Sequence, residues 1–187
     1  MDLTNEYYQI ETETRDLKFW KRRDGLSEET KNIIKNANLM IVPWDFKREL
    51  AQSSFPVKTE EIFQFFKQNA EGNVEVDISE NESDYRELAL HGDIVWLGTF
   101  VVSSIIVPVF VNILNKYLEK RIINNTNPII QINVIIDPEG KADQLPKKFS
   151  YKKPYIELEN YRKDLVLYSK YGSLEKKAEK GGFNEIV

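Results

Sequence analysis

His91 is the only histidine in the chain, and two carboxylates near it could make it a general base. Asp93 follows two residues later and Glu87 precedes it by four, so either acid could orient the imidazole ring for proton abstraction in a hydrolase. The sequence offers no cysteine, no second histidine and no Ser-x-Gly elbow to act with it. We therefore expect His91 to make an ordinary hydrogen bond at a loop or a helix end, and a hydrolase centred on His91 and Asp93 is an alternative.

Groups of acidic residues could bind Mg²⁺ or Ca²⁺ through their oxygen atoms. They are Asp45 with Glu49, Glu80 with Glu82 and Asp84, and Asp137 with Glu139. The segment 77–84 lacks the spacing of an EF-hand loop and its central glycine. These acids are typical of a solvated surface, and we predict no metal site and no cofactor.

Lysine and arginine stand beside aromatic residues in two places. The stretch Trp20-Lys21-Arg22-Arg23 could contact a phosphate or an acidic partner, although a surface turn would have the same composition. Near residues 147–155, alternating lysines and aromatics are typical of a basic binding patch or of a protected strand edge. The residues that we predict to contact a partner are Trp20, Trp44, Lys147, Lys148, Lys152, Lys153 and Tyr155.

The overall charge argues against nucleic acid as that partner. The chain has a net charge of −4 and a pI near 5.3, which gives no general attraction to a polyanion. The charge is uneven, with 12 basic and 20 acidic residues in 1–93 but 11 basic and 7 acidic residues in 141–187. Surfaces of opposite sign steer association with a complementary protein or with a second copy. We therefore predict a non-catalytic binding or adaptor component.

The cellular compartment follows from what the sequence lacks. The absence of cysteine excludes disulfides and thiolate metal sites and is compatible with a reducing cytoplasm. The first residues have neither a basic nor an apolar segment of the kind found in a signal peptide. We expect a cytoplasmic protein.

The most apolar stretch, residues 94–114, carries no charge and has the length of a bilayer-spanning helix. A membrane-associated effector with one spanning segment there is the second alternative. However, Ser104, Pro108, Asn112 and Asn115 would form a weakly polar stripe on a helix, which lipid does not favour. We expect instead a buried strand or loop over 94–102, followed by a helix from about 104 to 121 that packs on a sheet.

The remaining pattern predicts one α+β domain with a small mixed sheet and flanking helices. Residues 1–24 read as a polar arm, 25–172 as the domain, and 173–187 as a frayed tail. The strands are expected at 39–42, 74–78, 129–136 and 147–151.

Several short motifs resemble an uncharacterised family of small bacterial proteins, which implies an α+β fold and no known activity. They are Val42-Pro43, Phe55-Pro56, the alternating run 74–78, Leu90-His91-Gly92-Asp93, Tyr117-Leu118-Glu119-Lys120-Arg121 and Tyr151-Lys152-Lys153-Pro154. Residues 115–141 are also similar to adaptor domains encoded beside effectors in prokaryotic conflict systems. This second resemblance implies a binding role, for which antiviral defence is one setting.

Overall fold

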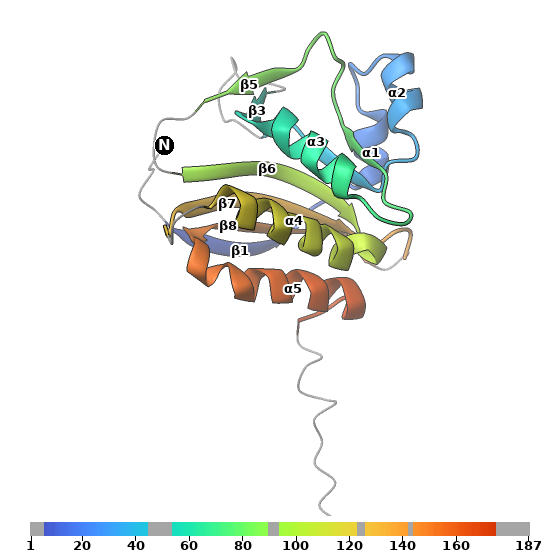
Figure 1. Ribbon diagram of the computed structural model, residues 1–187. Coiled ribbons are helices and arrows are strands. Elements are labelled where there is room, and N and C mark those ends of the chain that lie inside the picture. The colour runs from blue at the N-terminus through green and yellow to red at the C-terminus, as the bar shows by residue number, and fades with distance from the viewer. Residues whose placement is uncertain (1–5, 45–53, 90–93, 123–125, 142–143, 175–187) are drawn as a thin grey trace, which may run out of the picture.

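A six-stranded mixed sheet runs through the computed structural model, which describes residues 6–44, 54–89, 94–122, 126–141 and 144–174. The strand order is β1-β8-β7-β6-β2-β4 (Figure 1). In chain order these strands are β1 Tyr7–Thr12, β2 Leu39–Val42, β4 Val76–Ile78, β6 Ile94–Ser103, β7 Ile129–Asp137 and β8 Lys147–Pro154. The predicted single α+β domain with a mixed sheet is confirmed.

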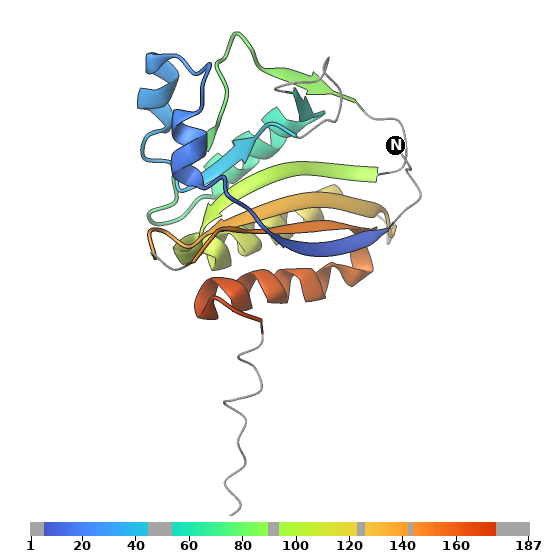
Figure 2. The same ribbon diagram turned by 180° about the vertical axis from the view of Figure 1, so that it is seen from behind.

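Helices cover both faces of this sheet (Figures 1 and 2). One face carries α3 Thr59–Asn69, α4 Val107–Arg121 and α5 Leu158–Tyr171. The opposite face carries two short helices, α1 Leu17–Arg22 and α2 Glu28–Ile34. Two further short strands, β3 Ser54–Pro56 and β5 Arg86–Leu88, pair in parallel beside α3. The sheet therefore has apolar contacts on both sides.

The apolar stretch 94–114 is divided between a strand and a helix. Strand β6 ends at Ser103, a single 3-10 turn covers Ser104–Ile106, and α4 begins at Val107. Pro108 lies in the first turn of α4, where its missing N–H has no intrahelical acceptor to lose. The helix predicted for 104–121 is thus confirmed as α4. Among the described residues, no helix has both the length and the apolarity needed to cross a membrane.

The main core lies between the sheet and the three helices α3, α4 and α5. Side chains at alternate positions of the strands, such as Phe100, Val134 and Phe149, point into it and are fully buried. Phe66 of α3 and Phe110 of α4 pack against Phe100 with ring centroids 5.5 and 5.4 Å apart. The polar stripe on α4 lies on its outer side, where Pro108 and Asn112 are exposed.

The first residues do not form the exposed arm that their polarity suggested. Residues 7–12 are the edge strand β1, which pairs antiparallel with β8 in unbroken register. Tyr8 anchors this strand, because its ring packs on Tyr161 and its hydroxyl donates to Asp164 at 2.8 Å. An edge strand needs apolar contacts on one face only, so a polar sequence suffices. Most of the predicted tail, residues 175–187, lies outside the described residues.

Candidate functional site

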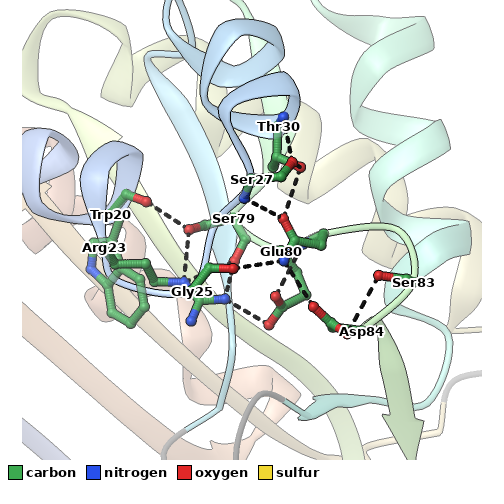
Figure 3. Close-up of polar contacts among 10 residues, drawn as sticks. Trp20, Arg23, Gly25, Ser27, Thr30, Ser79, Glu80, Ser83 and Asp84 are labelled. Carbon is green, nitrogen blue, oxygen red and sulfur yellow. Dashed lines mark hydrogen bonds and ion pairs between the residues drawn. The ribbon is translucent and has the colours of Figure 1, made fainter.

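Helices α1 and α2 form a separate layer that a polar network ties to the rest of the domain (Figure 3). Arg23, just after α1, pairs with Glu80 at 2.6 Å and also donates to the carbonyl of Ser79 at 2.9 Å. The side chains of this ion pair are only 17% and 4% exposed, so little water competes for it. The hydroxyl of Ser79 in turn donates to the carbonyl of Trp20 at 2.8 Å.

Asn81 completes this network by bonding to the loop between α1 and α2 and to the first turn of α2. Its side-chain oxygen accepts from the Ser27 amide at 2.8 Å and from the Thr30 hydroxyl at 2.9 Å. Its side-chain nitrogen donates to the carbonyl of Gly25 and to Asp84, both at 2.8 Å. Ser27 caps α2 by accepting from the Thr30 amide at 3.0 Å. The two helices are therefore held in a fixed position.

A cavity of about 710 Å³ lies between these two helices and the end of β7, and we call it the α1–α2 groove. Five cations line it, three from α1 and two from α2 or the residue that follows it. They are Lys18, Lys21, Arg22, Lys31 and Lys35. Because positions three or four apart share a helix face, the cations of each helix project on the same side. The remaining lining residues are Asp16, Leu17, Asp137, Glu139 and Gly140.

The acids of the α1–α2 groove do not neutralise these cations directly. Asp16 caps α1 by accepting from the Phe19 amide at 2.6 Å. Asp137 is buried and accepts from the amides of Leu17 at 2.8 Å and Glu139 at 2.7 Å. Glu139 is exposed and makes no side-chain ion pair within the described part of the chain.

Most of the cations are likewise without an ion-pair partner. Lys31 pairs with Glu28 at 2.9 Å, which leaves four cations that form no ion pair with any described residue: Lys18, Lys21, Arg22 and Lys35. Lys21 is half-buried, and this burial lowers the pKa of its ammonium group, while Asp137 and Glu139 partly offset that effect. A groove of unpaired cations is suited to bind a carboxylate or a phosphate.

The turn that forms one wall of the groove has an unusual backbone. Glu139 and Gly140 both have positive φ angles, 50° and 69°. A positive φ angle is unfavourable for a residue with a side chain. The hydrogen bond from the Glu139 amide to the Asp137 carboxylate holds Glu139 in this conformation.

The lysines of β8, in contrast, already contact other residues of the domain. Lys147 donates to Thr12 at 2.6 Å, Lys148 pairs with Glu11 at 3.2 Å, and Lys153 pairs with Glu157 at 2.8 Å. Lys152 is 5% exposed. Side chains alternate along β8, so Lys148 and Lys152 point to the opposite face from Lys147 and Lys153. The four lysines do not form the single basic patch that their spacing suggested.

Two of the three aromatic residues predicted to anchor a partner are buried. Trp20 is 7% exposed and packs in the small core under α1 and α2, with the Arg15 guanidinium 5.3 Å from its ring. Trp44 is 8% exposed and packs edge-to-face on Trp96. Tyr155 is half-buried. Trp20 and Trp44 therefore lack the exposed rings that a partner anchor requires, because both complete the apolar cover of the sheet.

Only one of the three predicted hydrolase residues can be placed, because His91 and Asp93 lie outside the described residues. Glu87 is described, and it caps α3 from the neighbouring strand. Its carboxylate accepts from the amides of Lys58 at 2.8 Å and Glu60 at 2.9 Å, and from the Tyr85 hydroxyl at 2.7 Å. Burial opposes ionisation, but these bonds outweigh it and hold the pKa of Glu87 below its usual range. An ionised, fully bonded carboxylate is a structural cap, whereas the hydrolase stays a prediction.

The acid groups considered as metal ligands have other roles where they are described. Glu80 pairs with Arg23, and Asp84 accepts from Asn81. Asp45 and Glu49 lie outside the described residues. In the described ranges, no three acidic or histidine side chains gather as a metal site would require.

Sequence reasoning missed a polar layer on the α1–α2 side of the sheet. Gln131 and Asn133 alternate with aliphatic residues along β7 and are 4% and 8% exposed. Asn133 donates to Thr99 at 3.2 Å, and Ser150 lies opposite Asn133 on β8. The signal was present, because two amides at alternate positions of an otherwise β-branched strand indicate a face that is not fully apolar.

Comparison with known proteins adds no relative to this picture. No protein-family model, no curated protein and no solved structure matches the chain. The functional inference therefore depends on the geometry of the α1–α2 groove.

Proposed function

We propose that this protein is a non-catalytic adaptor that binds an acidic segment of a protein partner in the α1–α2 groove. The observation that carries the proposal is that Lys18, Lys21, Arg22 and Lys35 line one groove without ion-pair partners among the described residues. In a protein of net charge −4, such a cluster is a local field of opposite sign to the whole.

The fixed position of α1 and α2 favours a binding function for the groove over that of an ordinary solvated surface. A pre-organised site loses less conformational entropy when its ligand binds. The Arg23–Glu80 ion pair and the Asn81 bonds fix both helices before any ligand arrives. The volume of about 710 Å³ accommodates several acidic side chains.

A protein partner fits the charge better than nucleic acid. The net negative charge opposes long polyanions, whereas a short run of aspartate and glutamate needs only the local field. The resemblance of residues 115–141 to adaptor domains of conflict systems supports the same class. We place the proposed adaptor in the cytoplasm and, on that resemblance, in a bacterial defence system.

The test is binding of a fluorescent peptide rich in aspartate and glutamate, followed by anisotropy. The variant Lys18→Glu/Arg22→Glu should weaken binding at least about 10-fold. The matched control, Lys116→Glu/Lys120→Glu on α4, changes the net charge equally and should alter affinity by less than about 2-fold. Binding should also fall when salt is raised from about 50 to 500 mM.

Two results would overturn the proposal. Equal loss of affinity in the control variant would show a response to net charge alone. Tighter binding of a mixed-sequence oligonucleotide than of the acidic peptide would assign the groove to nucleic acid. A peptide with asparagine and glutamine in place of the acids, which should not bind, checks that carboxylates are recognised.

A further inference from the structure

Among the described residues, no strand pairs with the outer side of β1, so this edge of the sheet is open. Strand β1 pairs with β8 on one side and is the last strand in the order, whereas the other edge strand, β4, has only three residues. Residues 9–12 of β1 are exposed, and the strand contains no proline, lysine or arginine. Natural proteins usually protect an edge with charged residues, above all lysine, with proline or with a bulge; the only one of these in β1 is the charge of Glu11, which Lys148 pairs.

The backbone groups on this open edge can be identified from the hydrogen-bond alternation. The Glu13 amide donates to the carbonyl of Pro146 at 2.8 Å, which makes Glu13 a hydrogen-bonded position. In an antiparallel pair such positions alternate, so Tyr7, Gln9 and Glu11 bond to β8. It follows that the N–H and C=O groups of Tyr8, Ile10 and Thr12 point away from the sheet.

The pairing of β8 with β7 leads independently to the same assignment of outward-facing groups on β1. The Tyr155 amide donates to the carbonyl of Pro128 at 2.9 Å, which fixes the positions of β8 that bond to β7. The alternate positions, Lys148, Ser150 and Lys152, must then face β1. Their partners in the register are Glu11, Gln9 and Tyr7, which agrees with the assignment.

We propose that two copies of this chain associate through β1, antiparallel about a two-fold axis at Ile10. In this register Ile10 faces Ile10 of the second copy, and Tyr8 faces its Thr12, so every outward N–H and C=O of β1 gains a partner. An axis at Gln9 would pair Tyr8 with Ile10 and leave Thr12 without a partner within the strand. The six-stranded sheets of the two copies become continuous.

The side chains of β1 are self-complementary in this register. Ile10 is 40% exposed, and the contact buries it against its own copy. Glu11 faces Gln9 of the second copy, so no acid faces an acid across the axis. Lys148 already pairs with Glu11 at 3.2 Å and keeps its charge balanced at the junction. A second copy therefore satisfies the edge both in its backbone bonds and in its charges.

The absence of cysteine permits a test of the register by crosslinking. Gln9→Cys and Glu11→Cys chains, mixed under mild oxidation, should form a disulfide-linked dimer, because directly opposite residues lie within disulfide reach. Each variant alone should crosslink far less. Efficient crosslinking of Gln9→Cys alone would place the axis at Gln9 and overturn this register.

The association itself is tested by sedimentation of the cysteine-free chain. We expect a dimer that Ile10→Lys dissociates, raising the dimer dissociation constant at least about 10-fold. The control Ile156→Lys alters a more exposed isoleucine, 77% accessible, in the 3-10 turn before α5 and should leave the dimer intact. A monomer at all concentrations, or a dimer unaffected by Ile10→Lys, would overturn the proposal. Circular dichroism of both variants separates loss of association from loss of folding.

Discussion

Cations line two of the grooves that the described residues form, and these two grooves differ in what their cations contact. The second, which we call the α3–α4 groove, has a volume of about 420 Å³ and includes Lys58, Lys120 and Arg121. There Arg121 donates to the Tyr117 hydroxyl at 2.9 Å and lies 3.7 Å from Glu61, and the Lys120 ammonium lies 5.6 Å from the ring of Phe65. In the α1–α2 groove, four of the five cations form no ion pair with any residue that the structure describes.

This difference teaches how to separate a binding surface from a structural one. Cations that pair with an acid or a ring hold two helices together, and Arg121 and Lys120 join α4 to α3 in this way. Cations that form no ion pair contribute little to folding, and their charge stays free to attract an anionic ligand. The predictions below test whether the α1–α2 groove depends on its mounting and whether the α3–α4 groove is only structural.

The largest effect is expected from Arg23→Ala, which removes the ion pair and the hydrogen bonds that hold α1 beside the α1–α2 groove. The change leaves the Glu80 carboxylate buried without its cation, and we expect a loss of about 3 kcal/mol in the free energy of unfolding. Urea denaturation measures it, with Arg22→Ala, an exposed neighbour, as a control that should shift stability by less than about 0.5 kcal/mol. Equal effects from both substitutions would show that the polar network does not hold the helices.

Acid should weaken the same side of the molecule through Glu13. Burial raises its pKa, but bonds from Arg15 and from the amides of Thr14 and Arg15 outweigh this and lower it from 4.5 to about 2. Because the folded-state pKa lies below the unfolded value, the stabilisation is complete above pH 4.5 and is lost as the pH falls toward 2. Since Arg15 is about one-third exposed, we expect on the order of 2 kcal/mol.

The measurement compares the wild type with Glu13→Gln at pH 6 and at pH 2.5. The variant should be less stable at pH 6, and most but not all of this difference should be lost at pH 2.5, because that pH is still above the folded-state pKa of about 2. A constant difference across that range would mean that ionisation of Glu13 contributes nothing.

A smaller effect is expected from Tyr117→Phe in the α3–α4 groove. Burial is the main reason that the pKa of Tyr117 rises to about 12, so its hydroxyl is protonated and bridges Arg121 and Glu61. Its removal should lower stability by about 1 kcal/mol. Affinity for the acidic peptide should not change. A loss of peptide binding would break the distinction between the two grooves.

The smallest effect, and the only gain, is expected from Lys21→Met. The half-buried ammonium has no ion-pair partner among the described residues, so its replacement should raise stability by a few tenths of a kcal/mol. The same substitution should reduce peptide affinity by about 3-fold. Thermal unfolding and anisotropy on one sample measure both quantities. A stability loss would show that Lys21 has a structural role instead.

The sequence predicted those parts of the fold whose signal lies in their own residues. The aliphatic runs 39–42 and 129–136 are strands, and the helix expected from about 104 to 121 is the 3-10 turn Ser104–Ile106 followed by α4. Strand β1 was not predicted, because its five polar or aromatic residues and single isoleucine become a strand only through their pairing with β8. Tertiary context supplied what local pattern could not.

The same limit applies to the candidate site. For Trp20-Lys21-Arg22-Arg23 the sequence left two interpretations open, an anion contact and a surface turn, and the structure places Lys21 and Arg22 in the α1–α2 groove. The sequence did not separate Arg23, which pairs with Glu80, from its neighbours, because that acid lies 57 residues away. Lys31 and Lys35 were missed, since only the packing of α2 beside α1 brings them to the same groove.

The pairing of β1 with β8 also imposes an order on folding during synthesis. Tyr7 and Lys152 are neighbours in the sheet but are nearly a whole chain apart, so the first strand to leave the ribosome has no partner until the last has emerged. The Leu17 amide cannot form its hydrogen bond to Asp137 until residue 137 has also been synthesised. The central βαβ unit of β6, α4 and β7 can form earlier, because its contacts are local in sequence. The nascent N-terminus is therefore the last part of the sheet to be fixed in place.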